Sequence, residues 1–287
     1  MTLLIEPEML ATLLNDEQLV VLDARFSLAD IKLGRVMYDQ GHIPGAIYAD
    51  LEKDLSGDII PGQTGRHPLP ESSDWLETLS RWGITEHSQI VVYDDGGHAM
   101  AARAWWLLRW ADLRHVSVLH GGMKAWLGGR YPVTADTSET IPALNHLTTG
   151  HMPVISADDL KAQIVSDGLL NPLVDARAHE RFRGEEESID PIAGHIPGAT
   201  CHPFTDNLND NGRFLPPEQL NEIFSSLTTG STSPVFYCGS GVTACHNILA
   251  MEYAGLPGAV LYPGSWSEWI TAPGRPVAKG EEIVQSY

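Results

Sequence analysis

The sequence predicts an α/β protein built from two tandem domains of one fold, each a mostly parallel sheet with helices on both faces. Two observations support this fold class. Several blocks of sequence occur twice, in the same order, along the 287 residues. Within each half, short β-branched runs alternate with segments of helical periodicity, which is the pattern of a parallel sheet covered by helices. The length suffices for two domains of ordinary size.

Three recurring blocks indicate the duplication. The pairs are residues 22–25 (Leu-Asp-Ala-Arg) with 174–177 (Val-Asp-Ala-Arg), 41–46 with 194–199 (both Gly-His-Ile-Pro-Gly-Ala), and 90–93 (Ile-Val-Val-Tyr) with 234–237 (Pro-Val-Phe-Tyr). Blocks repeated in constant order are typical of one domain copied in tandem. We therefore expect an N-terminal domain over residues 1–137, a linker rich in Thr and Pro over 138–153, and a C-terminal domain over 154–287.

The expected elements follow in the same order in both halves. An amphipathic helix is expected over residues 1–14. Strands are expected at 18–22, 90–93 and 116–119, and again at 172–174, 235–237 and 259–262. Helices are expected at 73–82 and 99–110, and again at 217–227 and 243–253. The strand runs are apolar on successive residues, as in strands buried on both faces. Ligands of such sheets bind beyond the carboxyl ends of the strands.

The composition excludes several classes of partner and location. With 37 acidic and 18 basic side chains the formal net charge is −19. Nucleic acids and anionic membranes are therefore excluded as partners, since both require a basic surface. The most apolar stretch, residues 99–113, is interrupted by Arg103 and Arg109, so we expect a buried helix there and no membrane span. Three cysteines do not make a disulfide scaffold, and a cytoplasmic location is expected.

A cysteine loop follows the predicted strand 235–237. Cys238 starts the run Cys-Gly-Ser-Gly-Val-Thr, which leads directly into a predicted helix. The N–H groups of a glycine-rich turn and the positive end of a helix both favour a thiolate, which is the nucleophilic form of cysteine. Cys238 is therefore the predicted nucleophile. The backbone groups expected to hold its bound sulfur belong to Gly239, Gly241, Val242 and Thr243.

The repeat provides an internal comparison for this loop. Aligning Tyr93 with Tyr237 places Asp94 opposite Cys238, so the first domain keeps the turn and has no cysteine nucleophile. A cysteine phosphatase needs an arginine six positions after its cysteine to hold the phosphoryl oxygens. Ala244 stands there, which disfavours phosphate-ester hydrolysis and leaves sulfur transfer. Cys201 and Cys245 are expected to be packing residues.

The chain resembles the two-domain rhodanese family of sulfurtransferases from end to end. The paired blocks, the cysteine loop and Gly-Ser-Trp-Ser-Glu-Trp at 264–269 carry the resemblance. It implies two tandem rhodanese-like domains, the C-terminal one catalytic, and a neutral loop similar to the 3-mercaptopyruvate sulfurtransferase type. The implied reaction moves a sulfane sulfur from 3-mercaptopyruvate, through a cysteine persulfide, to cyanide, a thiol or a thioredoxin-like protein. No metal or organic cofactor is implied. The alternatives are thiosulfate as the donor, or a non-catalytic sulfur-relay module.

The resemblance also implies substrate-binding residues. Arg181 matches the family's substrate-binding arginine, and Arg183 is an auxiliary candidate. The alternative is that both are surface arginines paired with acidic residues 185–187. Relatives often carry a second arginine further along this loop, whereas residues 184–190 read Gly-Glu-Glu-Glu-Ser-Ile-Asp.

A Ser/His/Asp arrangement for proton handling is implied as well. Ser240 and His67 match its first two members. Asp54 is the candidate for the third, with Asp58 as the other possibility. The paired His42 and His195 are expected to be structural, because one of them lies in the domain without a nucleophile. The paired Asp23 and Asp175 are expected to cap turns.

Overall fold

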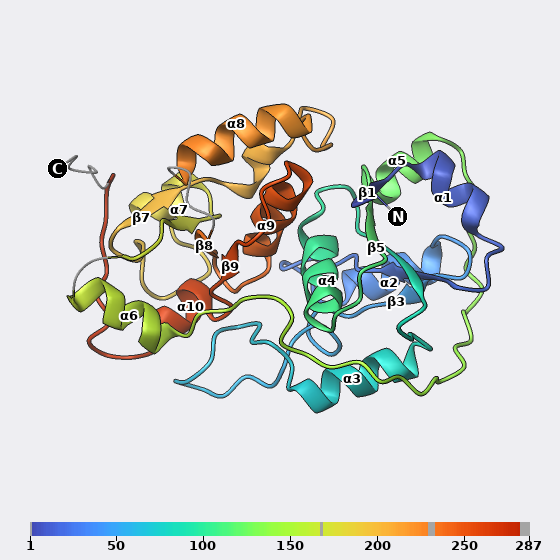
Figure 1. Ribbon diagram of the computed structural model, residues 1–287, viewed down its shortest axis with the longest axis horizontal. Helices are drawn as coiled ribbons and strands as arrows, with labels where there is room; N and C mark the ends of the chain where they lie inside the picture. Colours follow the sequence, from blue (N-terminus) through green and yellow to red (C-terminus); the bar gives the residue numbers. More distant parts are fainter. Residues whose placement is uncertain (1, 167–168, 229–232, 282–287) are drawn as a thin grey trace. The chain divides into compact units, whose positions relative to one another are not determined.

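The computed structural model describes residues 2–166, 169–228 and 233–281. The chain forms two compact units (Figure 1). Unit 1 comprises Met1–Gly57, Pro70–Met152 and Asp210–Arg213, and unit 2 comprises Asp58–Leu69, Pro153–Asn209 and Phe214–Tyr287. Residues 58–69 therefore pack in unit 2, although the repeat places them within the predicted N-terminal domain. The last residues of the predicted C-terminal domain, 282–287, lie outside the described residues.

Unit 1 contains a five-stranded sheet in which every neighbouring pair is parallel. Its strand order is β1-β5-β4-β2-β3. The strands are β1 (Leu4–Ile5), β2 (Leu19–Asp23), β3 (Ile47–Tyr48), β4 (Gln89–Tyr93) and β5 (Val116–Leu119). The expected helix over residues 1–14 is thus partly wrong. Leu4 and Ile5 pair with β5, and the helix begins only at Pro7, a residue that favours a first helical turn.

The helices of unit 1 cover both faces of this sheet. They are α1 (Pro7–Leu13), α2 (Leu33–Gln40), α3 (Ser72–Arg81), α4 (Ala99–Trp110) and α5 (Gly122–Gly128). Val91 and Tyr93 of β4 pack with residues of α1, α2 and α5. Because side chains alternate along a strand, Ile90 and Val92 point to the opposite face, where α4 packs against β4 and β5. The four residues of β4 from Ile90 to Tyr93 are all buried, as the apolar run predicts.

Unit 2 repeats this architecture with a four-stranded parallel sheet of order β7-β6-β8-β9. The strands are β6 (Leu173–Asp175), β7 (Ala199–Cys201), β8 (Val235–Tyr237) and β9 (Val260–Leu261). A single parallel bridge between Val154 and Leu261 takes the place that β1 has in unit 1. The register pairs Asp175 with Tyr237, so Cys238 begins where β6 and β8 end. The cysteine loop therefore leaves the sheet at its carboxyl edge.

The helices of unit 2 also lie on both faces. They are α6 (Ala157–Ser166), α7 (His179–Arg183), α8 (Pro217–Leu227), α9 (Thr243–Tyr253) and α10 (Ser265–Trp269), with a 3-10 turn, η1, at Phe204–Asn207. Tyr237 packs with apolar residues of α6, α7 and α10. Phe236 points to the other face and meets Phe224 of α8 edge to face, while α9 packs against β8 and β9 (Figure 1). In the described part of the chain, no helix is long and apolar enough to cross a membrane.

Candidate active site

Cys238 stands at the start of the turn between β8 and α9, with only 2% of its surface exposed. The N–H of Gly241 donates to its Sγ at 3.2 Å, and the N–H of Cys238 donates to Ser265 Oγ at 3.0 Å. Gly241 has a φ of +78°, and a Cβ there would lie 2.2 Å from the carbonyl oxygen of Pro263. The turn therefore requires glycine at this position in order to aim its N–H at the sulfur.

The carbonyl groups of the turn bond to α10. The C=O of Cys238 accepts from the N–H of Trp266, and the C=O of Gly239 accepts from the N–H of Ser267, both at 2.9 Å. Backbone carbonyls held in this way do not oppose a negative charge on Sγ. The geometry therefore fits the predicted cradle for an anionic sulfur.

Ser265 is a site residue that the sequence analysis missed. It is fully buried, and its φ of +56° is uncommon for a residue with a side chain. Gly122 has the same φ in unit 1, and each of the two residues lies four positions before a buried tryptophan, Trp269 or Trp126. The repeat thus replaces glycine by serine only beside the cysteine. The hydroxyl gained there accepts the N–H of Cys238.

His67 and Ser240 lie together, as the sequence predicts. Nδ1 of His67 and Oγ of Ser240 share a hydrogen bond of 2.8 Å, and both residues are buried. The segment that carries His67 belongs to unit 2 and approaches α10 closely. A Cβ on Gly65 would lie 2.5 Å from the carbonyl oxygen of Gly264, so glycine is needed for this approach.

The structure does not place Asp54 with this pair. Asp54 belongs to unit 1, where its carboxylate accepts the N–H of Asp50 at 2.9 Å and pairs with Arg81 at 2.7 Å. Asp58, the other candidate, belongs to unit 2 and is exposed. The third member of the implied Ser/His/Asp arrangement therefore stays a prediction.

Arg181 and Arg183 separate into different environments, although both lie on α7. Arg181 donates to both carboxylate oxygens of Glu187 and, through Nη2, to Asp190 at 3.0 Å. Arg183 donates to Glu185 at 2.9 and 2.8 Å, which is the surface pairing considered as the alternative for both arginines. Of the two, only Arg181 borders the cysteine loop, where its Nη1 would lie 3.6 Å from a Cβ on Gly239.

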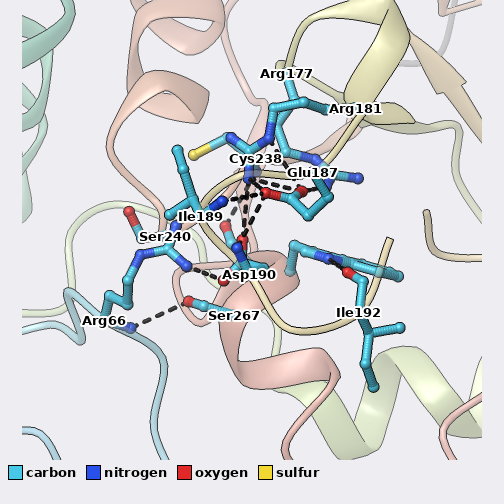
Figure 2. A network of polar contacts seen from close by, with 12 residues as sticks. Arg66, Arg177, Arg181, Glu187, Ile189, Asp190, Ile192, Cys238, Ser240 and Ser267 are labelled. Carbon is cyan, nitrogen blue, oxygen red and sulfur yellow. Dashed lines mark hydrogen bonds and ion pairs between the residues drawn. The ribbon is translucent and has the colours of Figure 1, made fainter. Parts of the chain in front are cut away.

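Arg66 is a second site residue that the sequence analysis did not identify. Its Nη1 donates to Oδ1 of Asp190, and its backbone N–H donates to Oγ of Ser267 at 3.1 Å. Figure 2 shows Asp190 between the guanidinium groups of Arg66 and Arg181. The signal available in the sequence is that Arg66 directly precedes His67.

The two carboxylates of this network differ in their ease of protonation. Burial raises the pKa of Asp190, as does the nearby charge of Glu187, although Arg66 and Arg181 oppose the shift. Burial would also raise the pKa of Glu187, but two backbone N–H groups and Arg181 bring it below its ordinary value. Glu187 is therefore the firm ionic partner of Arg181.

Unit 1 shows what occupies the same cradle where the cysteine is absent. One carboxylate oxygen of Asp94 accepts the N–H groups of Gly96 and His98 at 2.9 and 3.0 Å. The other accepts those of Met100 and Ala101, in the first turn of α4, at 3.1 and 3.2 Å. A fixed carboxylate thus takes the anionic position at this helix N-terminus. The turn is retained in unit 1 as structure, in agreement with the predicted loss of its nucleophile.

The remaining cysteines bond to the backbone. The Cys245 thiol donates to the carbonyl oxygen of Gly241 at 3.3 Å, and the Cys201 thiol donates to that of Arg177 at 3.4 Å. Burial raises the pKa of Cys201 to about 12. Both thiols thus have the surroundings of packing residues.

The paired histidines and aspartates hold the backbone in both units. Nδ1 of His42 and of His195 bonds a carbonyl oxygen, at 2.8 and 2.7 Å, which fits their predicted structural role. Asp23 and Asp175 accept backbone N–H groups two residues on, as turn-capping residues do. Each also binds the arginine of its own block, Arg25 or Arg177.

Comparison with known proteins agrees with this geometry. The family model of the rhodanese-like domain matches residues 6–128 and again residues 156–272. A Pseudomonas aeruginosa protein named as a 3-mercaptopyruvate sulfurtransferase is 51% identical over 281 residues, 97% of this chain and 98% of its own. A Mycobacterium tuberculosis protein named as a thiosulfate sulfurtransferase, SseB, is 42% identical over 266 residues, 91% of this chain and 90% of its own.

A solved structure supports the same assignment. The 3-mercaptopyruvate sulfurtransferase from Leishmania major superposes with a TM-score of 0.82 at 28% identity, covering 93% of this chain and 74% of its own. Both halves of the chain match one family model, and the P. aeruginosa relative is 51% identical over nearly the full length of both chains. The chain therefore belongs to the rhodanese family, of which it carries two tandem domains.

Proposed function

We propose that this chain is an enzyme that transfers a sulfane sulfur from 3-mercaptopyruvate to a thiophilic acceptor through a persulfide on Cys238. The observation that carries the proposal is the 2.8 Å contact between His67 and Ser240 beside the cysteine turn. It supplies a proton-handling pair, which a thiol donor needs. The cysteine turn itself has backbone donors and no cationic side chain. The relatives named above include sulfurtransferases of the same donor class.

The first half-reaction transfers the donor's sulfur without an external oxidant or reductant. The Cys238 thiolate attacks the donor sulfur and forms the S–S bond while the donor's C–S bond breaks. The bonding pair of the C–S bond leaves on carbon as the enolate of pyruvate. That enolate takes up a proton, and the thiol proton of the donor is lost from the persulfide. The N–H of Gly241, 3.2 Å from Sγ, stabilises negative charge on the sulfur.

His67 and Ser240 would manage these protons. The Ser240 hydroxyl lies two residues after the nucleophile, and the imidazole of His67 can accept or donate through it. Both side chains are buried, so bulk water has little access to a proton held between them. This role is specific to a thiol donor, because the sulfite released from thiosulfate needs no proton.

The second half-reaction returns the enzyme to its thiolate. An acceptor such as cyanide, a small thiol or a thioredoxin-like protein attacks the outer persulfide sulfur and removes it, which completes a double displacement. We place this chemistry in the cytoplasm, because free thiols persist in a reducing compartment. None of the three cysteines, all of which the structure describes, forms a disulfide.

Steady-state kinetics with two donors test the choice of substrate. With cyanide as the common acceptor, we expect kcat/KM for 3-mercaptopyruvate to exceed that for thiosulfate. The M. tuberculosis relative's name favours thiosulfate as the second candidate donor. A kcat/KM for thiosulfate about tenfold above that for 3-mercaptopyruvate would overturn the proposal. Intact-mass spectrometry after donor exposure separates both enzymes from a sulfur-relay module, which would gain no sulfur atom from either small donor.

Replacing His67 by alanine should slow the two donor reactions unequally. Loss of positioned proton transfer costs about 100-fold or more, so we expect that fall in kcat/KM for 3-mercaptopyruvate. The thiosulfate reaction should change by less than about threefold, because its leaving group needs no proton. His179→Ala, at a half-exposed histidine of unit 2, is the matched control. Equal losses for the two donors would remove His67 from proton handling.

A further inference from the structure

Two guanidinium groups from distant parts of the chain converge beside the cysteine turn. A Cβ on Gly239 would lie 2.9 Å from Nη2 of Arg66 and 3.6 Å from Nη1 of Arg181. Arg66 comes from the 58–69 segment of unit 2, and Arg181 comes from α7. The absence of a side chain at Gly239 leaves room for both. A substrate group that lies next to the turn therefore meets two cations.

The two nitrogen atoms that converge on Gly239 are ones for which the described residues provide no acceptor. Nε and Nη2 of Arg181 bind Glu187, and Nη2 also binds Asp190. Nη1 of Arg66 binds Asp190. In the described ranges of the chain, no oxygen accepts a hydrogen bond from Nη2 of Arg66 or Nη1 of Arg181, and Nε of Arg66 is also buried without an acceptor. Each arginine thus presents one unused NH₂ group toward Gly239.

The carboxylate of Asp190 holds the pair in this arrangement. One of its oxygens binds Arg66 and the other binds Arg181, and its side chain is only 3% exposed (Figure 2). Glu187, equally buried, binds Nε and Nη2 of Arg181. The acidic loop at residues 184–190 therefore contributes to the site. It contains no arginine, but its last residue, Asp190, binds Arg66 from another segment.

We infer that Arg66 is a second substrate-binding residue, which with Arg181 binds the carboxylate of a 2-oxo-acid donor, and that Asp190 is the positioning residue for both guanidinium groups. This inference rests on the proposed function, because it assigns a place to the donor's carboxylate. Two NH₂ groups from different arginines match the two oxygens of a carboxylate. The acidic residues neutralise the two cations, so the donor gains specific hydrogen bonds more than net charge.

Pyruvate binding isolates this contact from the chemistry. Pyruvate keeps the 2-oxo-acid group and has no thiol, so its inhibition constant reports binding of that group without the sulfur chemistry. A charge-assisted hydrogen bond lost at such a site corresponds to about 10- to 100-fold in affinity. Arg66→Ala should therefore raise the pyruvate Ki and the KM for 3-mercaptopyruvate by that factor. The kcat should stay within about threefold, because Arg66 does not touch the reacting sulfur.

A donor without a carboxylate provides the decisive comparison. 1-Mercapto-2-propanone keeps the thiol and the ketone of 3-mercaptopyruvate and lacks its carboxylate. Arg66→Ala should leave kcat/KM for this donor within about threefold of wild type. Arg66→Lys should recover part of the lost pyruvate affinity, because it keeps the charge without the planar fork. Arg183→Ala, at the neighbouring surface arginine, should leave all these constants unchanged.

The role of Asp190 is tested by a double-mutant cycle on the pyruvate Ki. If Asp190 positions both arginines, Asp190→Asn should weaken pyruvate binding in the wild-type background and have a smaller effect beside Arg66→Ala, where only Arg181 remains to be positioned. Arg66→Ala leaves the buried Asp190 carboxylate without one of its two arginine partners, and the double variant removes that carboxylate charge as well. Independent, additive effects would overturn the positioning role.

Two results would overturn the assignment of Arg66. One is an equal loss with 3-mercaptopyruvate and 1-mercapto-2-propanone, which would indicate a structural role. The other is an unchanged pyruvate Ki in Arg66→Ala when Arg181→Ala raises it. Both are distinct from failure of the proposed function, which the wild-type comparison of 3-mercaptopyruvate with thiosulfate decides by itself.

Discussion

Replacing Cys238 with serine is expected to abolish sulfur transfer, with turnover lowered by at least about 1,000-fold for every donor. A serine hydroxyl is not ionised at neutral pH, and its oxygen does not form the persulfide. The substitution is otherwise conservative. Serine fits a site where Cys238 is 2% exposed, and the N–H of Gly241 can donate to its oxygen. The loss would therefore report chemistry and not folding.

Two measurements check this expectation. Steady-state turnover of 3-mercaptopyruvate gives the rate, and intact-mass spectrometry after donor exposure should show one added sulfur atom on wild type and none on the variant. Cys245→Ser is the matched control, because its thiol is also buried and bonds the carbonyl oxygen of Gly241 in the same turn. It should keep most of the activity. Comparable losses in the two variants would contradict the assignment of Cys238 as nucleophile.

The sequence predicts the architecture well because the same order of strand and helix patterns occurs in both halves. The buried strands β4 and β8 appear as apolar runs in both halves, and the following helices begin after turns that need glycine. The shorter elements, such as β3, β7 and α7, leave no such pattern. Strands of two or three residues carry too few side chains for alternation to be visible, and tertiary pairing alone defines them.

The cysteine cradle is also predictable, because its physics is local. Cys238 and Gly241 are three residues apart, and the helix that follows is continuous with them. Partners that arrive from far along the chain are different. Arg66 meets Asp190 across 124 positions, and no periodicity in the sequence indicates that contact. Glu187 and Asp190 appear in the sequence only as acidic residues of a loop, although both are buried ion-pair partners.

The packing of residues 58–69 in unit 2 was likewise not predictable from the repeat. Repeated blocks align the two copies, but they do not show in which unit a segment between them packs. The contacts that hold this segment depend on single residues. Gly65 permits a close approach to Gly264, and the backbone N–H of Arg66 reaches Ser267. These contacts bring Arg66 and His67 to the site together.

Replacing Asp175 by asparagine should destabilise unit 2 strongly. Its carboxylate accepts hydrogen bonds from Nε and Nη2 of Arg177 at 3.0 and 2.6 Å, and both side chains are at most 1% exposed. Arg177 also lies over the ring of Trp266, 4.8 Å from its centre. Removing one partner of a buried ion pair costs about 3–5 kcal/mol, and we expect the lower end of that range because Glu187 stays 3.5 Å from Nη1 of Arg177. That is a large fraction of the stability of an ordinary domain.

The duplicated architecture makes this prediction specific to one unit. Asp23 and Arg25 form the same pair in unit 1, at 2.6 Å. Hydrogen exchange followed by mass spectrometry gives the opening free energy of each strand separately. In Asp175→Asn, we expect protection to fall in β6 and β8 and to stay near wild type in β2 and β4, with the reverse pattern in Asp23→Asn. Arg183→Ala, which breaks ion pairs only with the exposed carboxylates of Glu180, Glu185 and Glu281, should change neither sheet. Unchanged protection of β6 and β8 in Asp175→Asn would show that the buried pair does not hold this sheet. Loss confined to those strands would show that the motif shared by both halves stabilises each unit on its own account.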